Sequence, residues 1–113
     1  MTDRNYLFVC SQNRLRSPTA EQIFADVPGI HTMSAGTNRD AEEPLTDELV
    51  EWADFIFVME RPQRNKVQAK HRKALKDTRL IVLDIPDEYD FMDPHLIRLL
   101  ETKMQRWLPM AHP

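Results

Sequence analysis

Short apolar runs alternate with longer segments along this chain. Each run is only a few residues long and nearly continuous in apolar character, which is typical of strands buried on both faces of a parallel sheet. We therefore predict four β-strands, at Asn5–Val9, Ile30–Ser34, Asp54–Met59 and Arg79–Asp84.

Helical patterns separate and follow these runs. The last helix has a clear start, with Asp93 in the N-cap position and Pro94 in the first helical position. Acidic residues directly after Thr46 mark another start, because they favour the positive end of a helix. We predict helices over Pro18–Asp26, Thr46–Trp52 and Arg61–Lys76, and from Pro94 to about Trp107.

The order of these elements is strand–helix repeated four times. Right-handed crossovers turn this order into a small four-stranded parallel open sheet with helices on both faces, an α/β fold. The 113 residues are enough for one domain, and we expect residues 1–113 to form it, with a frayed tail over 109–113. Ligands of such sheets bind at the carboxyl ends of the strands.

Composition narrows the class of protein. The chain is 42% apolar and 29% charged with a net charge of −3, so its overall charge does not favour nucleic acid as a partner. A single cysteine excludes a disulfide framework and suits a reducing compartment. We see no signal peptide and no apolar run long enough to span a membrane. We expect a cytoplasmic protein that is a monomer or a weak dimer and does not bind membranes.

The only cysteine lies where the first strand turns into a helix. The segment is Cys10-Ser11-Gln12-Asn13-Arg14-Leu15-Arg16-Ser17. Such a loop directs backbone amides and a helix N-terminus at one point, which makes an anion site and stabilises a thiolate. Arg16 can hold two oxygens of a bound oxyanion with its planar guanidinium. These residues indicate phosphoryl transfer through a cysteine nucleophile, with residues Ser11 to Ser17 holding the phosphate.

Three chemically distinct segments fall at the same edge of the predicted sheet. Cys10 ends the first strand, Ser34 ends the second, and Asp87 follows the fourth. Because the carboxyl ends of parallel strands meet at one edge, we expect these residues to lie close together.

Four segments resemble the low-molecular-weight protein tyrosine phosphatase family. The Cys-x5-Arg-Ser run is the most specific, and the other three follow it in the family's order: Ser34-Ala35-Gly36-Thr37, Ala53-Asp54-Phe55-Ile56-Phe57-Val58-Met59 and Ile85-Pro86-Asp87-Glu88-Tyr89. The resemblance implies a hydrolase that cleaves phosphotyrosine or small aryl phosphates through a phosphocysteine at Cys10. The four histidines show no metal-ligand spacing and there is no Cys-x-x-Cys, so we expect neither a metal nor a cofactor.

The resemblance also assigns supporting roles around Cys10. It implies that Asn13 shapes the loop and that Ser34 braces the loop by a hydrogen bond to Asn13. Ser17 can donate its hydroxyl to the thiolate, or it can cap the helix. Arg14 points either to solvent or toward the flank of a substrate.

Hydrolysis also needs a general acid for the leaving oxygen. The candidate carboxylates are Asp84, Asp87, Glu88, Asp90 and Asp93. We choose Asp87 because it lies in the loop after the strand. Asp93 stays an alternative, since Asp93-Pro94 is similar to the Asp-Pro of the family. Tyr89 is either an aromatic wall beside the substrate or a half-buried loop residue.

Several features depart from the family pattern or leave other functions open. Gln12 replaces a glycine and Leu15 replaces the second cysteine of many members, while a short segment between Gly36 and Asp54 predicts an open site.

Two rival functions are an arsenate reductase that uses an external thiol and a non-catalytic phosphate-binding module. The basic helix Arg61–Lys76 is either a solvated face or a docking surface for an acidic partner or RNA.

Overall fold

The structure is a computed structural model that describes residues 3–109 of the chain. Four parallel strands form one sheet in the order β2-β1-β3-β4. Their bounds are Arg4–Cys10 for β1, Ile30–Gly36 for β2, Phe55–Val58 for β3 and Arg79–Val82 for β4. The predicted four-stranded parallel α/β fold is therefore confirmed. Apart from Pro109, the tail that we expected to fray lies outside the described residues.

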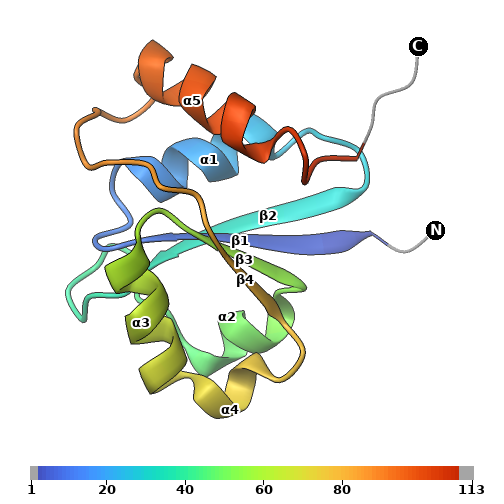
Figure 1. Ribbon diagram of the computed structural model, residues 1–113, viewed down its shortest axis with the longest axis vertical. Coiled ribbons are helices and arrows are strands. Elements are labelled where there is room, and N and C mark those ends of the chain that lie inside the picture. Colours follow the sequence, from blue (N-terminus) through green and yellow to red (C-terminus); the bar gives the residue numbers. More distant parts are fainter. Residues whose placement is uncertain (1–2, 110–113) are drawn as a thin grey trace.

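Helices cover both faces of this sheet (Figure 1). On one face lie α1 (Arg16–Phe24) and α5 (Pro94–Met104). On the other lie α2 (Asp47–Trp52), α3 (Arg61–Lys70) and α4 (Arg72–Leu75). In the part of the chain that the structure describes, no helix has the length and apolar character needed to cross a membrane.

The prediction of one helix over Arg61–Lys76 is wrong, because the helix is interrupted at His71, between α3 and α4. The backbone of His71 leaves the helical region, with φ −121° and ψ 26°. The His71 Nδ1 atom lies 2.6 Å from Asp47 Oδ1, so its side chain is engaged with the start of α2. After the break, α4 packs beside α2 and buries Ala74. Contacts with a neighbouring helix therefore override the local helical pattern.

Alternating side chains of β1 serve two separate cores. Tyr6, Phe8 and Cys10 face the helices α1 and α5, whereas Leu7 and Val9 face the other layer. All five are at least 97% buried, which explains the nearly continuous apolar run in the sequence. Cys10 is thus the last inward-facing residue of a central strand.

The position of β1 in the sheet also locates the ligand site. The chain leaves β1 for β2 on one side and later crosses to β3 on the other side. Neighbouring connections therefore diverge at the carboxyl end of β1, and a crevice forms at such a switch point. The loop after Cys10 starts in that crevice.

Candidate active site

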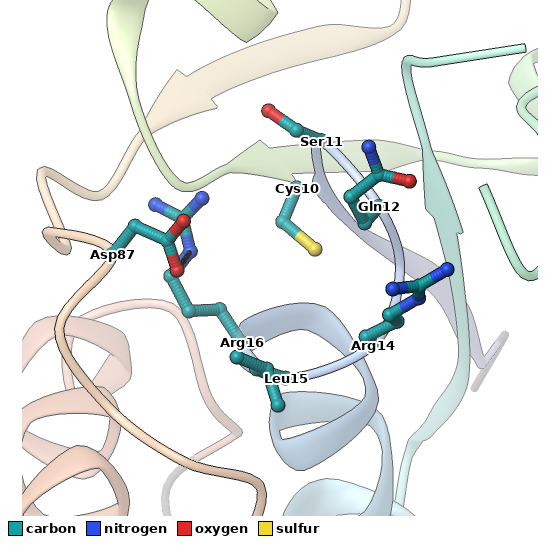
Figure 2. Close-up of a pocket in the computed structure, with 7 residues that line it drawn as sticks. All are labelled: Cys10, Ser11, Gln12, Arg14, Leu15, Arg16 and Asp87. Atoms are coloured by element: carbon teal, nitrogen blue, oxygen red, sulfur yellow. Dashed lines mark ion pairs between the residues drawn. The ribbon is translucent and has the colours of Figure 1, made fainter. Parts of the chain in front are cut away.

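A small pocket opens at the carboxyl end of β1. Its volume is about 190 Å³, and Figure 2 shows the residues that line it: Cys10, Ser11, Gln12, Arg14, Leu15, Arg16 and Asp87. Six of them belong to one loop, and Asp87 comes from the segment between β4 and α5. The expected meeting of Cys10 with Asp87 is therefore seen in the geometry. Asn13 and Ser17 lie behind the lining.

The backbone of the loop is oriented by the segment that follows β2. Three loop carbonyls accept hydrogen bonds of 2.9–3.0 Å: Cys10 O from Thr37 N, Ser11 O from Asn38 N and Gln12 O from Glu42 N. Within residues 3–109, no carbonyl accepts from the amides of Ser11, Gln12, Arg14, Leu15 and Arg16. Three carbonyls of this loop are thus occupied while five of its amides have no carbonyl acceptor, and unpaired amides between a strand and a helix N-terminus favour the binding of an anion.

The Cys10 sulfur receives direct hydrogen bonds. The Asn13 amide donates to Sγ at 3.2 Å, and Ser17 Oγ lies 2.9 Å from Sγ. Asn13 Nδ2 donates to the same Ser17 Oγ at 2.9 Å, and the Ser17 proton has two acceptors within reach, the sulfur at 2.9 Å and Ala35 O at 3.4 Å. Asn13 reaches both partners because its backbone is left-handed, with φ 56°.

The predicted hydrogen bond between Ser34 and Asn13 is wrong. The Ser34 hydroxyl bonds instead to a carboxylate oxygen of Glu21 on α1. Asn13 turns toward Ser17 in the first turn of α1, so the loop is braced by the helix that follows it. Ser17 is also not the N-cap, because α1 begins at Arg16.

Arg16 is buried and held from several sides. Its Nη1 donates to Glu60 Oε1 at 2.5 Å and to Ile85 O at 2.9 Å, and its Nε lies 3.7 Å from Asp87 Oδ1. These contacts occupy Nη1 and leave Nη2 and Nε for a ligand. A guanidinium fixed in this way can bind an oxyanion with little loss of conformational entropy.

Glu60 and Gln63 were missed by the sequence reasoning. Glu60 is the N-cap of α3 and forms a capping box with Gln63. Gln63 is 2% exposed, and its Nε2 donates to Ser11 Oγ at 3.1 Å. The signal was present, because Glu-x-x-Gln directly follows the third predicted strand, at the same sheet edge as Cys10.

Asp93, the alternative general acid, and Tyr89, the aromatic candidate, do not line the pocket. Asp93 is the N-cap of α5, and its Oδ1 accepts from the His95 amide at 2.8 Å. Tyr89 packs against the core cluster below α5 and does not line the pocket. The Asp87 carboxylate, 64% exposed, is the acid that faces the Cys10 loop.

Gly36 permits close packing of the two loops. A Cβ at this position would lie 2.5 Å from Ala41 Cβ, 2.6 Å from Ser11 O and 3.0 Å from Asn13 N. Close approach, rather than a positive φ, is therefore what requires glycine here. The Ser-Ala-Gly-Thr segment acts as a support for the Cys10 loop.

Charged and polar side chains form the rim of the pocket. Arg14 Nε lies 3.2 Å from Glu42 Oε1, and both side chains are about three-fifths exposed. Gln12 Oε1 is buried and has no hydrogen-bond partner among the residues that the structure describes. The site therefore has a polar rim, and no aromatic side chain is among its lining residues.

No family model matches the chain. A curated relative named probable low molecular weight protein-tyrosine-phosphatase EpsP, from Ralstonia nicotianae, is 24% identical, with 94% of each sequence covered. That alignment extends over 139 positions, more than the 113 residues of this chain, so the relative carries additional residues.

Solved structures share the fold. The tyrosine phosphatase Wzb from Escherichia coli K30, in complex with phosphate, has a TM-score of 0.75 and 22% identity, covering 95% of this chain and 96% of its own. The YwlE arginine phosphatase from Geobacillus stearothermophilus has a TM-score of 0.70 and 20% identity, covering 96% and 99%.

These comparisons confirm the resemblance to the low-molecular-weight protein tyrosine phosphatases. The fold of the chain is the fold of these enzymes, and the relatives found by sequence and by structure are phosphatases by name. The prediction of a phosphatase is thereby supported.

Proposed function

We propose that this protein is a cysteine-dependent phosphatase that hydrolyses phosphotyrosine or small aryl phosphates. The observation that carries the proposal is the surrounding of Cys10. Its sulfur is held by Ser17 and Asn13 beside a cluster of unpaired amides, and Arg16 and Asp87 form the adjoining wall. The relatives' names point to the same class of reaction.

In the first step, the Cys10 thiolate attacks phosphorus opposite the ester oxygen. The loop amides and Arg16 hold the equatorial oxygens of the phosphoryl group. As the bond from phosphorus to the ester oxygen breaks, Asp87 donates its proton to that oxygen. The products are a phosphocysteine, a free alcohol or phenol and an ionised Asp87.

In the second step, water attacks the phosphocysteine. Asp87 accepts a proton from the water, and the bond between phosphorus and sulfur breaks. The Ser17 hydroxyl lies 2.9 Å from Sγ and donates to the departing thiolate. Inorganic phosphate then leaves, and both Cys10 and Asp87 return to their starting states.

The rim of the pocket favours an aryl phosphate over phosphoarginine. One structural neighbour is an arginine phosphatase, so both leaving groups must be considered. Here Arg14 lies at the pocket edge with an exposed side chain. Because Arg14 is paired with Glu42, this rim carboxylate is not free to bind a positively charged guanidinium product, whereas a phenol needs no such partner.

The proposed location is the cytoplasm, because Cys10 must remain a reduced thiol in order to attack. We propose a monomer or a weak dimer as the working form, which sedimentation velocity would check. The proposed reaction uses only protein side chains and water, so neither a metal nor a cofactor takes part.

The decisive test is hydrolysis of p-nitrophenyl phosphate. The assay is run at about pH 5.5, because the reaction needs a protonated general acid and a cysteine thiolate at the same time. Wild type and Cys10→Ser are compared with chelator present. We expect turnover in the wild type that vanadate blocks and that is absent in Cys10→Ser, while circular dichroism shows both folded.

The two rival functions give different results in the same assay. No turnover by folded wild type, together with reduction of arsenate when a thiol is supplied, would establish the reductase. Tight binding of phosphate without either reaction would establish a non-catalytic phosphate-binding module. Either result overturns the proposed phosphatase.

A further inference from the structure

Positive charge is concentrated in one segment of the chain. Residues 61–76 contain seven Lys or Arg and no Asp or Glu. The remaining residues carry eight Lys or Arg against eighteen Asp or Glu. A protein with a net charge of −3 thus has one strongly positive segment, which forms α3 and α4.

The cations of this segment are available on the surface. Among residues 3–109, none of the seven has an acidic partner within 4 Å, and six of them are exposed; Arg64 is half-buried. The seven are Arg61, Arg64, Lys66, Lys70, Arg72, Lys73 and Lys76. We call this surface the basic face.

The basic face begins at the active-site pocket. Glu60 and Gln63, in the first turn of α3, contact Arg16 and Ser11. Lys66 Nζ donates to Asn38 Oδ1 at 3.1 Å, and the Asn38 amide donates to Ser11 O. A chain bound in the pocket can therefore continue along α3, whose first turn contacts the pocket residues.

A hollow lies farther along the same face, where α3 meets α4. Its volume is about 630 Å³, and it is lined by Asn65, Gln68, Ala69, Arg72, Leu75 and Lys76. Its lining combines two cations, two amides and two apolar side chains. This mixture suits a peptide segment with carboxylates next to an apolar residue.

We propose that the basic face docks an acidic segment of a phosphoprotein substrate while the phosphorylated residue lies at Cys10. The inference rests on the proposed phosphatase function and adds a substrate class to it. The distance along α3 from Glu60 to Ala69 is about 14 Å at 1.5 Å per residue. An extended peptide covers this in about four residues, so acidic residues three to five positions from the phosphotyrosine reach the hollow.

An acidic protein segment fits this surface better than RNA. Residues 61–76 contain no Phe, Tyr or Trp, and the ring of His71 is half-buried and bonded to Asp47, so no platform for base stacking is present. The surface adjoins a pocket whose chemistry removes a phosphoryl group from a single residue. Both features favour a phosphorylated peptide.

The experiment compares two phosphotyrosine peptides that differ only at positions three to five from the phosphotyrosine, on either side. One has Asp and Glu there, and the other has Asn and Gln. We expect the acidic peptide to have a KM about 3- to 10-fold lower, since several exposed charge pairs contribute together. The difference should shrink at about 0.5 M salt, because exposed charges are screened.

Two double variants, each of which removes two positive charges, show which surface causes the preference for the acidic peptide. Arg72→Gln/Lys76→Gln removes both cations of the hollow, and Arg98→Gln/Lys103→Gln removes two exposed cations of α5 on the opposite face of the sheet. We expect the first variant to lose the preference and the second to keep it. Hydrolysis of p-nitrophenyl phosphate, which cannot reach the hollow, should be unchanged in both.

Each outcome decides the proposal. Equal KM values for the two peptides, or loss of the preference in the α5 variant, would overturn it while the phosphatase function stands. Displacement of the acidic peptide by a poly-uridine RNA at equal concentration would also overturn it, in favour of nucleic acid. Absence of p-nitrophenyl phosphate turnover indicates failure of the proposed function itself, so the two failures are distinguishable.

Discussion

Arg16 lies between two carboxylates that hold it with different strength. Glu60 Oε1 is 2.5 Å from Nη1, whereas Asp87 Oδ1 is 3.7 Å from Nε and belongs to an exposed side chain. An incoming phosphate can replace Asp87 on Arg16 without disturbing Glu60. Asp87 is then free to serve the leaving oxygen, and Glu60 keeps the guanidinium oriented.

This arrangement makes Glu60 a positioning residue, which two substitutions test. Glu60→Ala removes the partner of Nη1, and a hydrogen bond to a charged group contributes about 1.5–3 kcal/mol. We expect kcat for p-nitrophenyl phosphate to fall by about tenfold or more. Glu60→Gln keeps an acceptor oxygen and should retain more of the activity.

Inhibition by inorganic phosphate separates this role from general damage to the fold. Glu60 places a negative charge near the anion site, so its neutralisation should leave phosphate binding equal or tighter while kcat falls. A structural defect would weaken both. Unchanged kcat in Glu60→Ala would refute the positioning role.

Asp87 and Asp93 make a matched pair for the general acid. Asp87→Asn should lower kcat on a substrate with a poor leaving group by about 10²–10⁴-fold and keep phosphate binding. Asp93→Asn should change little, because asparagine caps a helix about as well as aspartate. The measurement is kcat against leaving-group acidity for both variants. The reverse result would make Asp93 the acid.

Single residues show what the sequence could and could not predict about the site. Cys10 and Asp87 were predictable because they end or closely follow a strand at the same sheet edge, and Arg16 because it lies six positions after Cys10 at the start of a helix. The hydrogen-bond partner of Ser34 could not be predicted. Glu21 reaches Ser34 from α1, and the apolar pattern of the sequence does not define how this helix is rotated about its axis. Glu60 was missed because a carboxylate directly before a helix does not by itself indicate a contact with Arg16, which lies 44 positions earlier.

Among the elements, the segment after β2 supports the Cys10 loop through Gly36. In Gly36→Ala the new Cβ would meet Ser11 O at 2.6 Å, and a backbone atom cannot move aside cheaply. We expect a loss of stability of about 1–3 kcal/mol. Activity should fall by about 10²-fold, because the displaced loop carries the phosphate-binding amides.

A second substitution identifies the contact responsible. Gly36→Ala/Ala41→Gly removes the clash with Ala41 Cβ and leaves the clash with Ser11 O. Urea unfolding should then recover part of the stability, while kcat/KM stays low. Full recovery of kcat/KM in the double variant would show that the Cys10 loop is not what Gly36 protects.

The elements themselves were predictable where burial determines the pattern. The four strands followed from their apolar runs, and the starts of α2 and α5 followed from their capping residues. The helix α1 begins two residues before Pro18, because amides of a first turn need no helical acceptor and proline is tolerated there. The break at His71 depends on α2, which local periodicity cannot reveal.

At the scale of the molecule, the chain is shorter than its relative and its pocket is small. The aligned EpsP sequence needs 139 positions to match a chain of 113 residues, so this protein lacks part of what its relative has. The pocket is small and is lined mainly by the residues from Cys10 to Arg16. It contacts only a small part of a protein substrate, so further contacts fall to surfaces outside it, which is the role proposed for α3 and α4.

The end of the described chain is tied to the sheet centre through Tyr6. Its hydroxyl donates to the Trp107 carbonyl, and the Trp107 ring packs against Phe55 and Phe57. Tyr6→Phe removes this hydrogen bond and leaves a carbonyl without its partner. We expect the free energy of unfolding at pH 7 to fall by about 1 kcal/mol.

The same substitution predicts a dependence on alkaline pH. Burial raises the pKa of Tyr6 above its ordinary value of 10.0, an effect that the nearby Arg4 partly offsets. The unfolded chain therefore loses this proton first, so the contribution of Tyr6 is fully present below pH 10.0 and is lost as pH rises through the folded pKa. Urea unfolding of wild type and Tyr6→Phe at pH 7 and at about pH 10.5 should show the difference between them narrowing. A constant difference would mean that the Tyr6 hydroxyl ionises as easily in the folded protein as in the unfolded chain.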